Sequence, residues 1–107
     1  AFNLRKIGLV DAQKGICEIL RKKGNRNQFL KAQKILSSKQ FYILNSLLNN
    51  LQLNGAKEAA DKLKYDILSS YDEYMSNPLM GKNRIMLWLI NYTPYSLWKE
   101  ILNMRFS

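Results

Sequence analysis

The chain has 107 residues, of which 47% are hydrophobic and 23% are charged, and its net charge is +9. This length allows one ordinary domain with its own core, and the composition excludes wholesale disorder. The sequence contains one cysteine and no histidine, so it lacks the commonest general base, the commonest metal ligand and any internal disulfide. We therefore expect a single domain over residues 1–107 that is not an enzyme and holds no cofactor or metal.

A first helix is predicted to begin near Asp11, which can act as its N-cap, and to end at Gly24. Residues 1–10 either extend this helix upstream or form an extended arm. The residues expected on its inward side recur at helical spacing. They are Ala12, Ile16, Ile19 and Leu20.

A second helix can be capped by Asn27, with Lys31 and Lys34 pointing away from its apolar side. That apolar side is expected to consist of Phe29, Ala32, Ile35 and Leu36. Residues 37–40 (SSKQ) form a weak capping-box pattern that either restarts the helix or lies inside a longer one. No charge occurs over residues 40–56. This segment should therefore run through the middle of the protein, or else be covered by a partner.

The second half of the chain shows two further helical stretches. Residues 56–76 follow a break at residues 54–55 and form the clearest amphipathic helix, which Asn77-Pro78 should end. Thr93-Pro94 is a helix-start pair, and Trp88 and Trp98 are expected in the closing wall of the core. The longest apolar run, residues 85–90, is far shorter than the ~20 residues that cross a bilayer. We predict an all-α bundle of about four helices without a transmembrane span, in which the second and last helices are either continuous or broken.

The positive charge is concentrated in the first third of the chain. Residues 1–39 contain ten Lys/Arg and two Asp/Glu (+8), residues 40–80 three and five (−2), and residues 81–107 four and one (+3), which sum to +9. A field of this sign attracts anionic partners and speeds their encounter with the protein. The charge alone does not distinguish an acidic protein surface from nucleic acid or from acidic lipid.

Three kinds of partner are compatible with this positive field. Residues 21–26 (RKKGNR) could contact phosphates nonspecifically, although cations and a glycine also suit a helix C-terminus. Residues 27–36 only partly meet the requirements of a membrane-surface helix. Docking on an acidic surface of a larger protein complex fits best, because the chain also has an uncharged central helix and clustered C-terminal aromatics. The alternative is nonspecific nucleic-acid binding by the basic N-terminal third.

The predicted partner-binding residues fall into two groups. Six cations are expected to steer and contact the partner, and two aromatic residues are weaker candidates for apolar anchors. The cations are Arg21, Lys22, Lys23, Arg26, Lys31 and Lys34, and the aromatics are Tyr95 and Phe106.

Residues 39–51 (KQFYILNSLLNNL) and 61–74 (DKLKYDILSSYDEY) resemble two helices of the small extrinsic PsbQ-type subunits on the lumenal side of photosystem II. The resemblance covers about a quarter of the chain. It implies a basic, cofactor-free helical bundle that docks on a membrane complex in the thylakoid lumen and stabilises it. It also implies a lost transit peptide, in keeping with our expectation that a chain starting at Ala1 is processed or trimmed.

Overall fold

The structure, a computed structural model, describes residues 4–106. This part of the chain has no strand and forms six α-helices and two short 3-10 helices. The α-helices are α1 (Ile7–Lys23), α2 (Arg26–Leu48), α3 (Ala56–Ser69), α4 (Tyr71–Met75), α5 (Lys82–Asn91) and α6 (Trp98–Phe106), and the 3-10 helices are Leu4–Lys6 and Tyr95–Leu97. The prediction of an all-α protein is confirmed, whereas the predicted count of about four helices is wrong.

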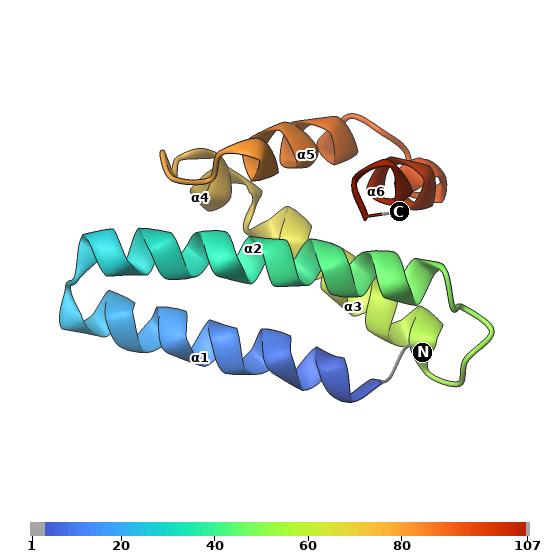
Figure 1. The fold of residues 1–107 in the computed structure, drawn as a ribbon, viewed down its shortest axis with the longest axis horizontal. Helices are drawn as coiled ribbons and strands as arrows, with labels where there is room; N and C mark the ends of the chain where they lie inside the picture. Colours follow the sequence, from blue (N-terminus) through green and yellow to red (C-terminus); the bar gives the residue numbers. More distant parts are fainter. Residues whose placement is uncertain (1–3, 107) are drawn as a thin grey trace.

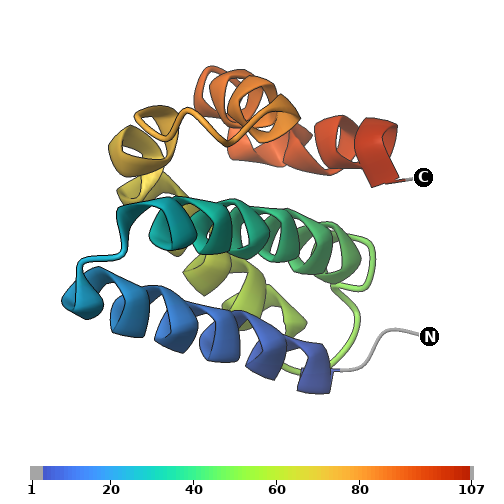
Figure 2. The same cartoon turned by 60° about the vertical axis from the view of Figure 1, so that its left-hand side comes forward.

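Helix α2 is the central element, and it packs against each of the other five α-helices. α1 runs alongside α2, with α3 on the same side of the molecule, while α5 and α6 lie on the opposite side of α2 (Figure 1). The turned view shows the same arrangement, with α2 between the two groups (Figure 2). Residues 40–48 of the uncharged segment therefore do run through the middle of the protein, as one of the two sequence-based alternatives predicted, whereas residues 49–55 form a mostly exposed connection to α3.

The predicted helix over residues 56–76 consists of two helices, α3 and α4. Ser69 Oγ donates to the carbonyl of Tyr65 at 2.8 Å, and the backbone N–H of Ser70 is shared among carbonyls of the preceding turn. Serine hydroxyls that bond back to the helix backbone loosen it. The helix therefore ends at Ser69 and a new one begins at Tyr71.

The C-terminal stretch also contains two helices, but Thr93-Pro94 does not start the second of them. Thr93 Oγ1 donates to the carbonyl of Leu89 at 2.6 Å and so completes the end of α5. Pro94 has a ψ of 144°, which is not helical. A 3-10 turn follows, and α6 begins only at Trp98.

Helix α2, by contrast, is unbroken across residues 37–40. The hydroxyl of Ser37 donates to the carbonyl of Lys34 at 2.7 Å, within the same helix, so it does not cap a new one. The N-cap of α2 is Asn25 rather than the predicted Asn27. Asn25 Oδ1 accepts from the backbone N–H of Gln28 at 3.2 Å, the capping bond that stabilises a helix start.

Helix α1 begins at Ile7, so Asp11 lies inside it and is not its N-cap. Three of the four residues predicted on the inward face lie outside, because Ile16 and Ile19 are 46% and 55% exposed and Ala12 is exposed as well, whereas Leu20 packs partly buried against the core. The buried line consists of Val10, Gln13 and Cys17. Gln13 is accepted inside because its Nε2 donates to the carbonyl of Ala32 at 3.0 Å. An internal hydrogen bond thus outweighs the apolar pattern.

The core is built around α2, whose Phe41, Leu44 and Leu47 are fully buried. Two large residues expected inside lie largely outside it, namely Ile35, which is 48% exposed, and Trp88, which is 52% exposed. Trp98 does lie in the core, where its Nε1 donates to the carbonyl of Thr93 at 2.9 Å. Half of the predicted aromatic wall is therefore surface.

Replacing Gly24 with alanine is expected to destabilise the protein, whereas replacing Gly15 is expected to stabilise it. Gly24 has a φ of +72° and ends α1, and its N–H donates to the carbonyl of Arg21. Gly24→Ala should destabilise the protein by about 1 kcal/mol, because a side chain is strained in the left-handed region. Gly15 lies in mid-helix with open space around it, so Gly15→Ala should stabilise by about 0.5–1 kcal/mol. Urea unfolding of both variants checks the prediction, which effects of the same sign would contradict.

Candidate functional site

The cations at the end of α1 differ in what surrounds them. Arg21 Nη2 lies 2.6 Å from Glu73 Oε1 on α4, and its guanidinium stacks 4.7 Å from the ring centre of Phe29. Arg21 is therefore neutralised and held by the fold. Lys22 and Lys23 are exposed on the same last turn, where cations also offset the helix dipole.

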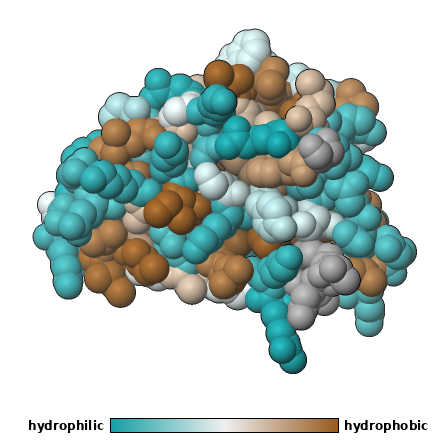
Figure 3. Space-filling view, viewed as in Figure 1, coloured by the Kyte–Doolittle hydropathy of each residue, from teal (hydrophilic) through white to brown (hydrophobic). Residues whose placement is uncertain are grey.

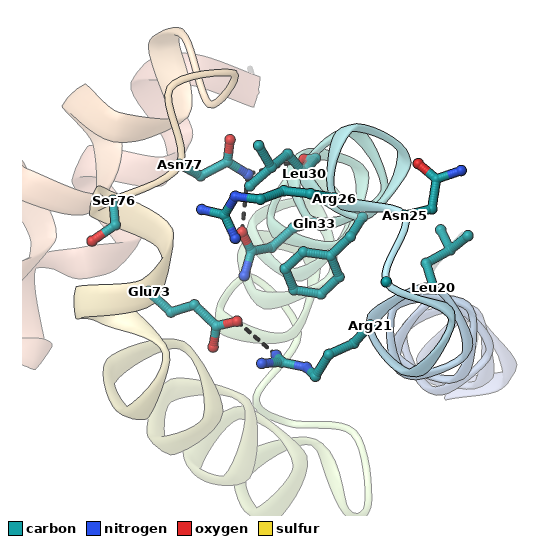
Figure 4. A pocket seen from close by; sticks show the side chains of 11 residues that line it. Leu20, Arg21, Asn25, Arg26, Leu30, Gln33, Glu73, Ser76 and Asn77 are labelled. Atoms are coloured by element: carbon teal, nitrogen blue, oxygen red, sulfur yellow. Dashed lines mark hydrogen bonds and ion pairs between the residues drawn. The ribbon is translucent and has the colours of Figure 1, made fainter.

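A cleft of about 310 Å³ opens between this turn, the start of α2 and the end of α4. Figure 4 shows Arg26 extending beside Asn77 and Gln33, while the Arg21–Glu73 pair lies on the other side of the cleft. Gln33 is buried, and its Oε1 accepts from Asn77 Nδ2 at 2.9 Å. Arg26 takes no part in the ion pairs found over residues 4–106. The cleft thus offers the Arg26 guanidinium for polar binding, whereas the Asn77 amide already donates to Leu30 and Gln33 within the fold.

A second cavity of about 330 Å³ adjoins the first and reaches the core at Cys17, Gln40 and Tyr74. Tyr74 Oη donates to Gln40 Oε1 at 2.6 Å. Burial raises the pKa of Tyr74, with smaller contributions from Cys17 and Glu73. Burial likewise raises the pKa of the Cys17 thiol. Both groups are therefore neutral near pH 7, which favours a packing role over nucleophilic chemistry.

The acidic residues are distributed over only part of the fold. Neither α2 nor α5 contains an acid, although α2 carries four cations and α5 carries two. The cations are Arg26, Lys31, Lys34 and Lys39 on α2, and Lys82 and Arg84 on α5. The eight acids lie on α1 (Asp11, Glu18), α3 (Glu58, Asp61, Asp66), α4 (Asp72, Glu73) and α6 (Glu100).

Cations from α2, α5 and α6 meet around one buried amide. Asn83 Nδ2 donates to the carbonyl of Lys34 at 3.4 Å, and Asn83 Oδ1 accepts from Arg105 Nη2 at 2.9 Å. A methyl group placed on Gly81 would lie 3.7 Å from Lys34 Nζ, so that ammonium reaches the start of α5. Arg84 Nη2 donates to the carbonyl of Asn77 at 2.9 Å.

We call this surface the basic seam. Its five residues follow the line where the α4–α5 connection and α5 meet α2. They are Arg26, Lys34, Lys82, Arg84 and Arg105. The N-terminus of α5 adds its own partial positive charge at the centre of the seam. Lys31, which was also predicted to contact the partner, is exposed on α2 but is not one of the five seam residues.

The two predicted aromatic anchors make contacts within the fold. Tyr95 lies at an edge-on angle to Trp98, with 5.2 Å between ring centres, and Lys64 Nζ lies 4.4 Å from the Tyr95 ring centre. Phe106 is half-buried and lies edge-on to Tyr42 at 6.0 Å. Neither side chain is as exposed as Trp88 or Tyr92.

Stability is expected to fall at alkaline pH partly because of Tyr95. Burial, together with the charge of Asp61 and a hydrogen bond to it, raises the pKa of Tyr95 to about 12, whereas an unfolded tyrosine has a pKa of about 10. The unfolded chain therefore loses this proton first, so stability is full below about pH 10 and declines between about pH 10 and 12. Urea unfolding at about pH 8 and pH 11 should show a smaller loss for Tyr95→Phe than for the wild type. An equal loss would contradict this assignment.

Sequence reasoning identified Arg26 and Lys34 but not Lys82, Arg84 or Arg105. The charge of +3 over residues 81–107 was the available signal. The cations of this segment are placed beside α2 by long-range contacts. Asn83, for example, contacts Ser37 and Lys34, which precede it by 46 and 49 residues. Those contacts have no counterpart in the local pattern.

None of the helices over residues 4–106 has the length and apolarity needed to cross a bilayer. In the same range, no three His, Cys, Asp or Glu side chains are grouped as metal ligands. No model of a known protein family matches the chain, and no curated protein and no solved structure was found to be similar to it.

Proposed function

We propose that this chain is a small, basic, non-enzymatic subunit that docks through the basic seam on an acidic surface of a larger protein complex. The observation that supports this proposal is the separation of charge between helices: α2 and α5 carry cations without acids, and seven of the eight acids lie on α1, α3 and α4. A surface of one sign steers an oppositely charged partner and sets its orientation.

Pairing within the fold strengthens this separation. Lys14 Nζ lies 2.7 Å from Asp66 Oδ2, and Arg21 is paired with Glu73, so the α1 side is partly neutralised. Two of the seam cations, Arg84 and Arg105, instead donate to neutral acceptors, namely the Asn77 carbonyl and the Asn83 side chain. Such bonds fix a guanidinium in place and leave its charge available to a partner.

The resemblance to PsbQ-type subunits extends the proposal to a particular kind of complex. A partner on the lumenal side of a photosystem II-like membrane complex would present the acidic surface, with the chain lying in the thylakoid lumen. The seam itself requires only that the partner surface be acidic, and peripheral membrane contact is the less favoured arrangement.

Nonspecific nucleic-acid binding is the second candidate, and one further feature favours it. Trp88 on α5 and Tyr92, which directly follows α5, are exposed with ring centres 5.5 Å apart, and Arg84 precedes Trp88 by one helical turn. Exposed aromatics beside a cation provide stacking platforms for single-stranded bases. This arrangement favours single strands over duplex DNA.

A charge-reversal pair tests the proposal with net charge held equal. The triple variant Lys34→Glu, Lys82→Glu and Arg84→Glu alters the seam, and Lys57→Glu, Lys62→Glu and Lys99→Glu is the matched control elsewhere on the surface. Polyglutamate and single-stranded RNA are the probes, titrated across a salt series. The seam variant should weaken polyglutamate binding about tenfold relative to the control. Equal effects of the two variants would contradict a localised site, and clearly tighter binding of RNA than of polyglutamate would favour the second candidate.

A further inference from the structure

Helices α5 and α6 also form an apolar groove, which is distinct from the charged surface of the seam. A groove of about 410 Å³ runs between the two helices. Ile85 and Leu89 form its α5 side, Ile101 and Met104 form its α6 side, and Met86 lies between them. Ile85 is 61% exposed and Met104 is 85% exposed, whereas Met86 is buried. Hydrophobic side chains are visible along the upper edge of the molecule, where α5 lies (Figure 3).

The groove has charge at only one end. Lys82 and Arg105 line it, and the bond from Arg105 to Asn83 places both cations at the start of α5. The N-terminal dipole of the same helix adds to this positive end. The other end, toward the connection between α5 and α6, contributes no charged side chain to the lining. The groove is therefore apolar along its length and basic at one end.

We infer that the groove binds an amphipathic, acidic α-helix of the partner protein, with apolar side chains at helical spacing and carboxylates near one end. This inference rests on the proposed function, because it describes which part of an acidic partner enters the site. A hydrophobic groove between two helices accepts the apolar stripe of a third helix, and the rim charges select its sign. A second copy of this basic chain would meet like charge at Lys82 and Arg105.

The exposed apolar stripe on α1 lacks these features. Ile16 and Ile19 form this stripe, but they project from a single helix, and Glu18 lies between them along that helix. The α5–α6 groove has two walls and a buried floor, which favour a protruding side-chain ridge over a flat lipid surface. This difference makes the α1 stripe a suitable control.

The test compares designed helical peptides on the intact protein. The first peptide repeats leucine at helical spacing with glutamate between, the second replaces glutamate with lysine, and the third is a scrambled form of the first. The leucine–glutamate peptide should bind about tenfold more tightly than polyglutamate, because it adds apolar burial. The lysine and scrambled peptides should not show this gain.

The variant Ile85→Ser with Met104→Ser should lose the gain while keeping wild-type binding of polyglutamate. Both side chains are largely exposed, so folding should be retained, and Ile16→Ser with Ile19→Ser is the control. Loss of the gain in the control pair instead would overturn the groove assignment and leave the seam proposal intact. If the wild-type protein does not bind polyglutamate, the proposal that the seam is a docking surface is wrong. Two further results would overturn the helix as the occupant of the groove. If the protein binds no peptide but binds anionic vesicles, and Ile85→Ser with Met104→Ser abolishes that binding, the occupant is a membrane surface. If the protein forms concentration-dependent dimers, the occupant is a second copy.

Discussion

Phe41→Ala is expected to lower the free energy of unfolding by about 3–5 kcal/mol, the cost of removing a buried aromatic ring and leaving a cavity. Phe41 is fully buried on α2, the helix that contacts the other five. The cavity can collapse little, since closing it would require α2 to move relative to several neighbours at once. Urea unfolding followed by far-ultraviolet circular dichroism measures the change.

Ile35→Ala on the same helix is the control for Phe41→Ala. Ile35 is 48% exposed, so its truncation should cost less than about 1 kcal/mol. A loss at Ile35 equal to that at Phe41 would mean that Ile35 is as deeply buried as Phe41, contrary to the structure.

Asn83→Leu is expected to cost about 2–3 kcal/mol and also to weaken the basic seam, because polar partners are left without their bonds. Asn83 Nδ2 donates to the hydroxyls of Ser37 and Ser38, each at 2.8 Å, while Asn83 Oδ1 accepts from Arg105. One side chain, 1% exposed, therefore connects α2, α5 and α6. Its loss should free Arg105 and loosen α5 against α2.

Urea unfolding and polyglutamate titration of Asn83→Leu should both show a loss. Asn91→Ala, at the exposed end of α5, is the control and should change stability by less than about 0.5 kcal/mol. A destabilised Asn83→Leu variant with wild-type affinity for polyglutamate would separate the network from the seam and contradict their coupling.

The features that could be predicted from the sequence are those fixed by local chemistry. Gly24 and Gly55 both have positive φ and lie at helix boundaries, as their positions in the sequence indicated. Helical spacing over residues 56–76 puts Ala60, Leu63 and Ile67 on one side, and all three are buried in the core. The break within this segment was missed because serine pairs occur within helices as well as between them.

The buried face of α1 could not be predicted, since two stripes compete for it. The stripe of Ile16 and Ile19 is the more apolar, yet Val10, Gln13 and Cys17 are buried. The outcome depends on a bond from Gln13 to the Ala32 carbonyl on α2 and on the approach of Lys39 Nζ to Gln13 Oε1 at 3.3 Å. Partners so far apart along the chain are not visible in a local pattern.

The candidate site shows the same division. The cations of residues 21–34 were apparent from charge counting, but Arg21 proved to be paired with Glu73, 52 positions away. The cations of α5 and α6 join Lys34 only through the packing of α5 on α2. Their charge could be counted in the sequence, but the sequence did not show that they lie on one surface.

Mapping polyglutamate on the isotope-labelled protein by nuclear magnetic resonance tests the docking surface most directly. The largest shifts on titration should fall at the backbone amides near Lys34, Lys82 and Arg84, and should decrease steeply as salt is raised. Shifts of equal size near Lys57 and Lys62 on α3 would show that the polyanion follows net charge alone, and the basic seam would then have no role in docking.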